Sequence, residues 1–321
     1  MSIGSDNFYT SERVNREAVS FPNQYQMKVA GNLFIPKDLQ PEQKAAALVI
    51  GHPMGAVKEQ AANLYATKMA EAGFVTLSLD LSFWGESEGR TRNMVSPDIY
   101  AEDFSAAVDF LRTCAQVDGE RIGGIGICGS GGFILSAAKI DSRLKAVATV
   151  SMYDMGEATR RGLGGSISNE MRKQMVEEAS LQRDVEFRGG ETRLTGGCPH
   201  EVDENSHPIA KEFYDFYRTP RGEYTPSTTT AACTTHPTLS SNVKFLNFYP
   251  FNDLASIAPR PLLFIAGENA HSYEFSEQAY KQAGQPKELL TVPGVGHVDL
   301  YDGVNVIPWE RLTAFFSANL G

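Results

Sequence analysis

The chain has 321 residues, of which 42% are hydrophobic and 21% charged, and its net charge at neutral pH is −10. Its length and apolar content suffice for the core of one large α/β domain, with or without an insertion. The negative charge argues against nucleic acid or an anionic membrane as a partner. Residues 1–17 are polar and lack the apolar core of a signal peptide, so we expect a cytoplasmic protein with reduced thiols.

The four cysteines do not follow a metal-binding or redox pattern. No CxxC motif or metal-type cluster relates Cys114, Cys128, Cys198 and Cys233. The sequence therefore predicts neither a metal site nor a cofactor.

The first part of the chain predicts an arm, a hairpin and then a regular alternation of strands and helices. Residues 1–24 form a polar arm with some helical spacing, and residues 25–35 fit a hairpin that bends at Gly31 and Asn32. Short apolar runs predict buried strands, and helical spacing separates them. The strands are expected at 46–50, 75–80, 121–127 and 146–151, and the helices at 59–72, 98–113 and from residue 133 onward. This rhythm predicts an α/β fold with a doubly wound, mostly parallel sheet.

A long insertion interrupts the alternation between the sixth and seventh strands. Residues 154–249 contain no further buried strand, although 170–181 and 207–217 have helical spacing, and several aromatic side chains occur there. We interpret 154–249 as a lid over the carboxyl ends of the strands, where open α/β sheets bind ligands. The core is then 25–153 together with 250–321, with strands at 261–266 and 287–292 and helices at 253–257, 273–283 and 308–320.

The stretch Gly126-Ile-Cys128-Gly-Ser130 joins a strand to a helix with the small-x-nucleophile-x-small spacing of a sharp elbow. Such a turn would expose the Cys128 sulfur at a helix N-terminus, which favours a thiolate. Alternatively, Cys128 has only a structural role, as a small buried hydrophobic residue in a packing turn. A second register makes Ser130 the nucleophile, but it lengthens the strand by two residues and puts a thiol where only a very small side chain fits.

A base and an acid are expected after later strands, in the order nucleophile, acid, histidine. His297 follows the last strand on a glycine-containing loop and is the candidate base. Glu268, after the 261–266 strand, is the candidate acid that would hold His297 through its Nδ1 atom. Asp154, after the 146–151 strand, is the second choice, whereas Asp299 is too close in sequence to His297 to face it.

The remaining parts of the candidate site are backbone donors and pocket walls. An oxyanion hole needs two N–H groups, for which Gly129 and Met54 are the candidates because Pro53 has no N–H. Trp84 and Tyr153 are expected to line the substrate pocket. Asp80 and the segment 85–89 predict a structural turn beside the elbow.

Four motifs together resemble the α/β-hydrolase superfamily over about residues 25–320. They are Gly-His-Pro-Met-Gly at 51–55, Leu-Asp-Leu-Ser-Phe-Trp-Gly-Glu-Ser at 79–87, Gly-Ile-Cys-Gly-Ser-Gly-Gly at 126–132 and Gly-His-Val-Asp-Leu-Tyr-Asp at 296–302. Within it, the chain is similar to the dienelactone-hydrolase-like branch that uses cysteine, and more closely to hydrolase-like polyketide transferases and cyclases of fungi. The resemblance implies a covalent acyl group on Cys128 with His297 as base. The sequence departs from the family pattern at Ala270, where aspartate is usual, and in its long insertion.

Three hypotheses on function follow. The first is hydrolysis of an ester, thioester or lactone through acyl-Cys128, as in a thioesterase. The second is an acyltransferase or macrolactone-forming cyclase that uses the same intermediate on a polyketide-like acyl thioester. The third is a non-catalytic binding protein on a hydrolase scaffold, against which the Cys128 and His297 pair argues. In the first two, the partner is a small acyl substrate, either free or linked to CoA or a carrier.

Overall fold

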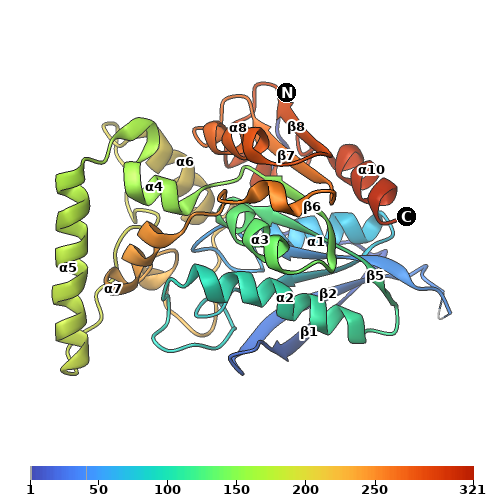
Figure 1. Ribbon diagram of the computed structural model, residues 1–321, viewed down its shortest axis with the longest axis horizontal. Helices are drawn as coiled ribbons and strands as arrows, with labels where there is room; N and C mark the ends of the chain where they lie inside the picture. Colours follow the sequence, from blue (N-terminus) through green and yellow to red (C-terminus); the bar gives the residue numbers. More distant parts are fainter. Residues whose placement is uncertain (1, 41) are drawn as a thin grey trace.

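The computed structural model describes residues 2–40 and 42–321 and has an eight-stranded sheet at its centre (Figure 1). The strands run in the order β1-β2-β4-β3-β5-β6-β7-β8, with β1 and β2 antiparallel to their neighbours and the other pairs parallel. Their bounds are Val14–Pro22 (β1), Lys28–Pro36 (β2), Ala45–Gly51 (β3), Val75–Leu79 (β4), Val117–Ile127 (β5), Leu144–Val150 (β6), Leu262–Gly267 (β7) and Lys287–Val292 (β8). The expected α/β fold with a mostly parallel sheet is confirmed.

Helices cover both faces of this sheet, as the alternation of strands and helices predicts. The α-helices are Ala61–Glu71 (α1), Pro97–Thr113 (α2), Gly129–Ile140 (α3), Met155–Arg161 (α4), Asn169–Phe187 (α5), Pro208–Tyr217 (α6), Leu239–Asn242 (α7), Tyr273–Gln282 (α8), Asp299–Asp302 (α9) and Trp309–Asn319 (α10). Short 3₁₀ helices span Leu163–Gly165 (η1), Ala231–Cys233 (η2), Val243–Asn247 (η3) and Leu254–Ile257 (η4). The apolar sides of α2, α3 and α8 join one core cluster, and those of α1 and α10 join the other. Strands β3 and β4 are buried along their whole length between these layers, which explains their uninterrupted apolar sequences.

The N-terminal region differs from the prediction. Strand β1 lies where a partly helical arm was expected, and it pairs along its length with β2. Most of its side chains are exposed because it is an edge strand, so its sequence carries little apolar signal. The expected bend at Gly31 and Asn32 is also wrong, because Lys28–Pro36 is one continuous strand. A Cβ atom at Gly31 would stand 2.8 Å from the Ser78 carbonyl oxygen, so this glycine permits close pairing with β4.

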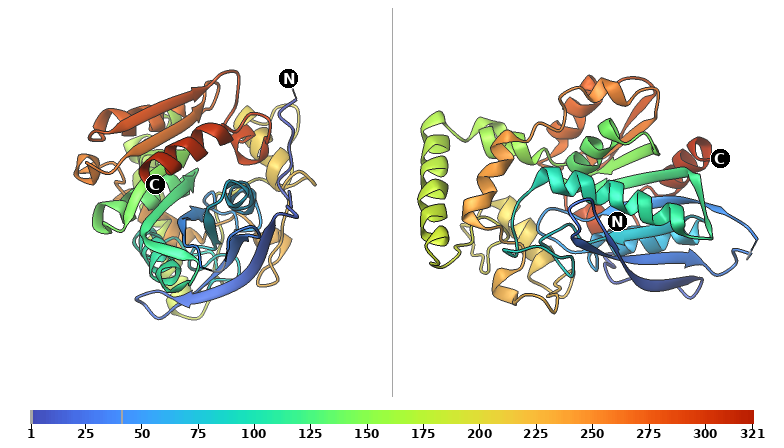
Figure 2. Two further views of the ribbon diagram at one scale, coloured as in Figure 1. Left: turned by 90° about the vertical axis from the view of Figure 1, so that its right-hand side faces the viewer. Right: turned by 60° about the horizontal axis from the view of Figure 1, so that its bottom comes forward.

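Between β6 and β7 the chain forms only helices and loops within the described residues, apart from an isolated bridge between Leu194 and Thr238. Helices α4, α5 and α6 gather on one side of the sheet, with α5 at the outer edge of the molecule, far from the C-terminus (Figures 1 and 2). We call residues 154–249 the cap. Its role as a lid remains a prediction. Among the described helices, none has the length and apolarity needed to cross a bilayer.

Candidate active site

Cys128 occupies a strained turn between β5 and α3. Its backbone has φ 53° and ψ −119°, a conformation that a non-glycine residue rarely adopts. Its N–H donates to Val150 on the neighbouring strand at 2.9 Å, and its carbonyl accepts from Gly131 at 2.9 Å, so the turn is fixed on both sides. A Cβ atom at Gly126 would collide with the backbone of Ser130 and Gly131. The small residue that the elbow pattern requires is therefore sterically necessary here.

The sulfur of Cys128 meets both expected oxyanion-hole donors. Burial raises the pKa of the thiol to about 11, although the Tyr301 hydroxyl and the N–H groups of Gly129 and Met54 lower it. Met54 follows β3 and Gly129 begins α3, so the two donors come from different elements that meet at the elbow. These N–H groups could stabilise a negative charge that develops beside the sulfur.

His297 lies fully buried on the loop after β8, where the sequence placed it. The Ser151 hydroxyl donates to its carbonyl at 2.9 Å, which ties the loop to the end of β6. Burial lowers the pKa of His297 well below its ordinary value, and nearby His271 lowers it further. The imidazole is therefore neutral at pH 7 and can accept a proton.

A tyrosine hydroxyl stands between His297 and Cys128. The Nε2 atom of His297 is 2.9 Å from the hydroxyl of Tyr301, and the same hydroxyl contacts the Cys128 sulfur. The other ring nitrogen, Nδ1, lies 2.6 Å from the Ser272 hydroxyl. Cysteine, tyrosine, histidine and serine thus form one continuous chain of polar contacts.

Neither expected carboxylate contacts His297 in the described structure, where Tyr301 and Ser272 occupy both ring nitrogens. Glu268 instead accepts the Gly294 N–H at 2.9 Å on an exposed part of the loop. The expected hydrogen bond from His297 to Glu268 is therefore wrong.

Asp154, the second choice for the acid, has a capping role in the structure. Its side chain accepts the Glu157 N–H at 2.8 Å and caps α4. Asp299 accepts the Gly296 N–H at 2.8 Å, whereas the described partners of the His297 ring nitrogens are Ser272 and Tyr301. Sequence reasoning expected a carboxylate because the fold commonly supplies one, whereas here Ser272, two residues past Ala270, fills the position at Nδ1.

One carboxylate of the cap does reach the His297 loop. Glu212 on α6 accepts the Val298 N–H at 2.8 Å, and its other oxygen lies 3.2 Å from His271 Nδ1. Burial would raise the pKa of Glu212, but hydrogen bonds from His271 and from the Val298 and His297 N–H groups bring it below its ordinary value. The ring of His271 lies 4.6 Å from that of His297, centre to centre. Glu212 thus connects the cap to the loop that carries the candidate base.

A cavity of about 300 Å³ opens beside the sulfur, between the core and the cap. Tyr153 lines it, as expected, together with Cys128 and Tyr301. The cap contributes mainly apolar side chains, among them Met155, Ala158, Phe213, Pro237 and Phe245. No lysine, arginine, aspartate or glutamate belongs to the described lining.

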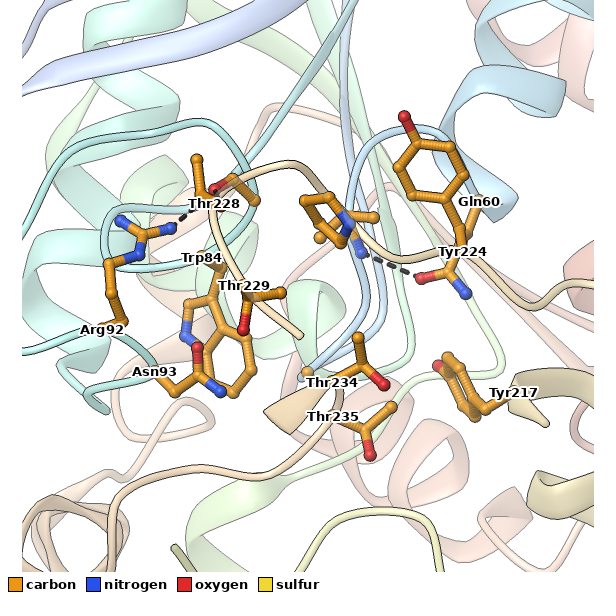
Figure 3. Close-up of a pocket in the computed structure, with 14 residues that line it drawn as sticks. Gln60, Trp84, Arg92, Asn93, Tyr217, Tyr224, Thr228, Thr229, Thr234 and Thr235 are labelled. Carbon is orange, nitrogen blue, oxygen red and sulfur yellow. Dashed lines mark hydrogen bonds between the residues drawn. The ribbon is translucent and has the colours of Figure 1, made fainter. Parts of the chain in front are cut away.

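Trp84 does not line this cavity. Its indole N–H donates to the Tyr100 hydroxyl at 2.8 Å. Its ring borders a smaller cavity of about 20 Å³ with Arg92 and Tyr224 (Figure 3). Tyr217 lines both cavities.

The Ser130 register is not supported by the geometry. Ser130 is fully buried, and its hydroxyl donates to the His52 carbonyl at 2.5 Å, so it is held inside the fold. The predicted structural turn beside the elbow is present, because buried Asp80 accepts hydrogen bonds from the Lys58 and Glu86 N–H groups.

Sequence reasoning missed Tyr301, Ser272 and Glu212. Tyr301 follows His297 by four residues, and because α9 begins between them the two side chains share one side of the turn, a spacing that could have revealed the pair. Ser272 and Glu212 become visible only when distant segments are brought together. Within residues 2–40 and 42–321, no group of three His, Cys, Asp or Glu side chains is arranged to hold a metal ion.

Comparison with known proteins matches one segment of the chain to a described family. Residues 29–161 match the Dienelactone hydrolase family. The uncharacterized protein PA2218 of Pseudomonas aeruginosa is 43% identical over 98% of this chain and 83% of its own length. Its crystal structure superposes with a TM-score of 0.92 over 98% of this chain and 97% of that one.

Fungal proteins with named activities are more distant. Thiohydrolase aneE of Aspergillus aculeatus is 26% identical over 76% of this chain and 74% of its own. Acyltransferase drtE of Aspergillus calidoustus is 23% identical over 91% of each chain. Both regions of similarity are longer than the segment 29–161 that matches the family.

Proposed function

Because the chain belongs to the dienelactone hydrolase family of the α/β-hydrolase superfamily, we propose that it cleaves an ester, thioester or lactone through a covalent acyl group on Cys128. The observation that carries the proposal is the position of the sulfur. It lies in the strained elbow, in contact with the N–H groups of Met54 and Gly129 and at the wall of a cavity large enough for a substrate.

The roles of the groups follow from their contacts. The sulfur attacks the acyl carbon, and the carbonyl oxygen takes the developing charge between the N–H groups of Met54 and Gly129. Neutral His297 is the base that receives the thiol proton, and it later activates the water that releases the acid. The loss of one oxyanion donor from such a site costs about 3 kcal/mol of transition-state stabilisation.

The cavity indicates which acyl groups fit. It has a volume of about 300 Å³, which is about twice that of an engineered protein cavity of about 150 Å³ that binds benzene. Its lining is mainly apolar and has no charged side chain. A carboxylate on the acyl chain would lose its hydration there without gaining a counter-charge. We therefore propose an uncharged, mainly apolar acyl group of medium length.

Acyl transfer or cyclisation is the second candidate. The cap supplies much of the apolar cavity wall, and a wall of this kind can exclude water, so that a hydroxyl group captures the acyl intermediate. Among the relatives, thiohydrolase aneE is named for hydrolysis and acyltransferase drtE for acyl transfer. Product analysis with and without an alcohol acceptor separates hydrolysis from transfer.

The proposal is tested by the turnover of a panel of acyl esters and thioesters by two variants of neighbouring residues. We expect Cys128→Ala to lose turnover by at least about 1000-fold, because the covalent route is removed. Ser130→Ala changes a buried hydroxyl of the same turn and serves as the matched control, for which most of the activity should remain. Wild-type turnover in Cys128→Ala would refute the covalent mechanism.

A further inference from the structure

The hydroxyl of Tyr301 is placed to pass a proton between two groups. It lies 2.9 Å from His297 Nε2. Tyr301 and Cys128 line the same cavity, and the hydroxyl lowers the pKa of the thiol. On the far side of the ring, the Ser272 hydroxyl lies 2.6 Å from Nδ1. All four side chains are buried, so bulk water does not compete for these contacts.

No carboxylate of the described residues joins this chain of contacts. The carboxylate of Glu212 bonds the Val298 N–H and His271, and that of Glu268 bonds the Gly294 N–H. A protonated His297 would therefore face only a serine hydroxyl at Nδ1. The imidazolium lacks the negative partner that holds it in a serine or cysteine triad with an acid.

We propose that Tyr301 carries the proton from Cys128 to His297, that Ser272 stands in the place of the acid, and that the site consequently favours acyl thioesters over alkyl esters. This inference rests on the acyl-Cys128 intermediate proposed above and specifies its substrate class.

Acylation combines the formation of one bond with the transfer of two protons. A bond forms between the sulfur and the acyl carbon, and the carbonyl electron pair moves to the oxygen between Met54 and Gly129. The proton leaves the sulfur for the Tyr301 oxygen, while the tyrosine proton moves to His297 Nε2. The Nδ1–H of the ring donates to Ser272 throughout, so the imidazolium carries the positive charge until the leaving group departs. The Nε2 proton then passes through Tyr301 to the departing group, and His297 is neutral again.

The leaving group then decides how the tetrahedral intermediate breaks down. A free thiol has a pKa of about 8.5, below the value of about 11 to which burial raises the pKa of Cys128, so the substrate thiolate departs more readily than the Cys128 thiolate. An alkoxide is far more basic, near water with its pKa of about 15.7, so it departs only when the imidazolium protonates it. Without that protonation the Cys128 thiolate is expelled and the ester is re-formed. The imidazolium proton on Nε2 faces the Tyr301 hydroxyl, so it reaches an alkoxide only through that hydroxyl, and this return dominates for alkyl esters.

The first experiment compares two substrates with the wild-type protein. The hexanoyl thioester of N-acetylcysteamine and hexanoyl ethyl ester share one acyl group and differ in the leaving atom. We expect kcat/KM for the thioester to exceed that for the ester by at least about 100-fold, the usual size of a general-acid contribution. Equal values would overturn the thioester preference, whereas acyl-Cys128 formation from either substrate would leave the proposed function standing.

The second experiment removes the bridging hydroxyl. Tyr301→Phe should slow acylation by the thioester about 100-fold, measured as the rate of adduct formation in acid-quenched samples. The matched control is Tyr65→Phe, because the Tyr65 hydroxyl donates to the Leu300 carbonyl at 2.6 Å and supports the same helix from outside the site. Its acylation rate should stay within about threefold of wild type at a temperature where both variants are folded.

Acylation of Tyr301→Phe at the wild-type rate would show that the thiol reaches His297 directly, and the relay would be refuted. Should Tyr301→Phe fail to fold, Ser272→Ala tests the same chain from its other end. The maximum of kcat/KM for the thioester, measured against pH, should then be lower. The part of the profile that is set by the pKa of the Cys128 thiol should stay at the same pH, because only the support of the imidazolium is removed. An unchanged profile in Ser272→Ala would refute the role of Ser272.

Discussion

At Cys128 burial outweighs the hydrogen bonds that favour a thiolate. The elbow pattern led us to expect an activated thiolate, yet the N–H groups of Met54 and Gly129 together with the Tyr301 hydroxyl do not offset the loss of water around the sulfur. Since burial also keeps His297 neutral, the resting pair is a thiol and an imidazole. In the proposed mechanism, the sulfur therefore becomes a nucleophile only as its proton moves.

This resting state predicts the pH dependence of alkylation at Cys128. Because the pKa of the thiol is raised to about 11, its reaction with iodoacetamide should be slow at pH 7 and continue to accelerate above pH 9. Peptide mapping distinguishes Cys128 from the three other free cysteines. A rate that levels off near pH 7 would indicate a thiolate–imidazolium pair and contradict this description.

Asp154→Asn separates a capping role from a catalytic one. Asparagine caps helices as well as aspartate does, so the hydrogen bond to Glu157 and the activity should both be retained. Burial raises the pKa of Asp154 to about 6, above the usual value in unfolded chains of about 3.9. Ionisation therefore costs folding free energy, and this cost appears as the pH rises from about 4 through 6.

The variant should accordingly gain stability relative to wild type over that pH range, by about 1–3 kcal/mol, in urea unfolding. Glu268→Ala is the companion variant, and it should also keep its activity because the carboxylate bonds only the Gly294 N–H. A hundredfold loss of kcat in either variant would identify that carboxylate as the missing acid.

Among the elements, α6 of the cap has the most direct connection to the site. Glu212 on this helix holds the Val298 N–H and His271, so the position of the His297 loop depends on a residue of the insertion. Phe213, the next residue, lines the cavity. The cap therefore supports the loop of the candidate base and also lines the cavity in which we propose that the acyl group binds.

Glu212→Ala should lower kcat about tenfold through misplacement of His297, and should increase proteolysis of the cap. The control is Glu201→Ala, which removes an exposed carboxylate from the same insertion. If both variants behave like wild type in the two assays, the cap does not position the base.

Helix α4 offers a test of where the acyl chain binds. Ala158 lines the cavity from this helix, and Ala158→Phe should fill part of it. Turnover of a hexanoyl thioester should fall at least tenfold, because the added ring occupies the space of the chain. An acetyl thioester should lose no more than about threefold, and equal losses for both substrates would place the acyl chain elsewhere.

For the molecule as a whole, the sequence predicted those features that depend on residues close together in the chain. Buried parallel strands have continuous apolar sequences, so the sheet could be predicted. The elbow could be predicted because the sharp turn at Cys128 requires small residues at positions 126 and 130. His297 could be placed because it follows the last strand. Strand β1 could not, because an edge strand with exposed side chains resembles a polar arm.

Contacts between distant segments lay beyond sequence reasoning. Glu212 reaches the His297 loop from a cap helix. Ser272 lies at His297 Nδ1, where we expected the carboxylate of Glu268 because Ala270 replaces the usual aspartate. Trp84 directly precedes the predicted turn at 85–89, yet its ring borders a separate small cavity. Fold and elbow follow from periodicity, whereas the partners of the imidazole depend on tertiary structure.

The most direct test of acyl-Cys128 catalysis is the intact mass of the protein after rapid mixing with excess hexanoyl thioester and acid quench, followed by peptide mapping. We expect a hexanoyl group on the peptide that contains Cys128, formed and lost at rates consistent with turnover, and no such adduct in Cys128→Ala. Turnover without an adduct, or an adduct on another residue that forms at the rate of turnover, would contradict it.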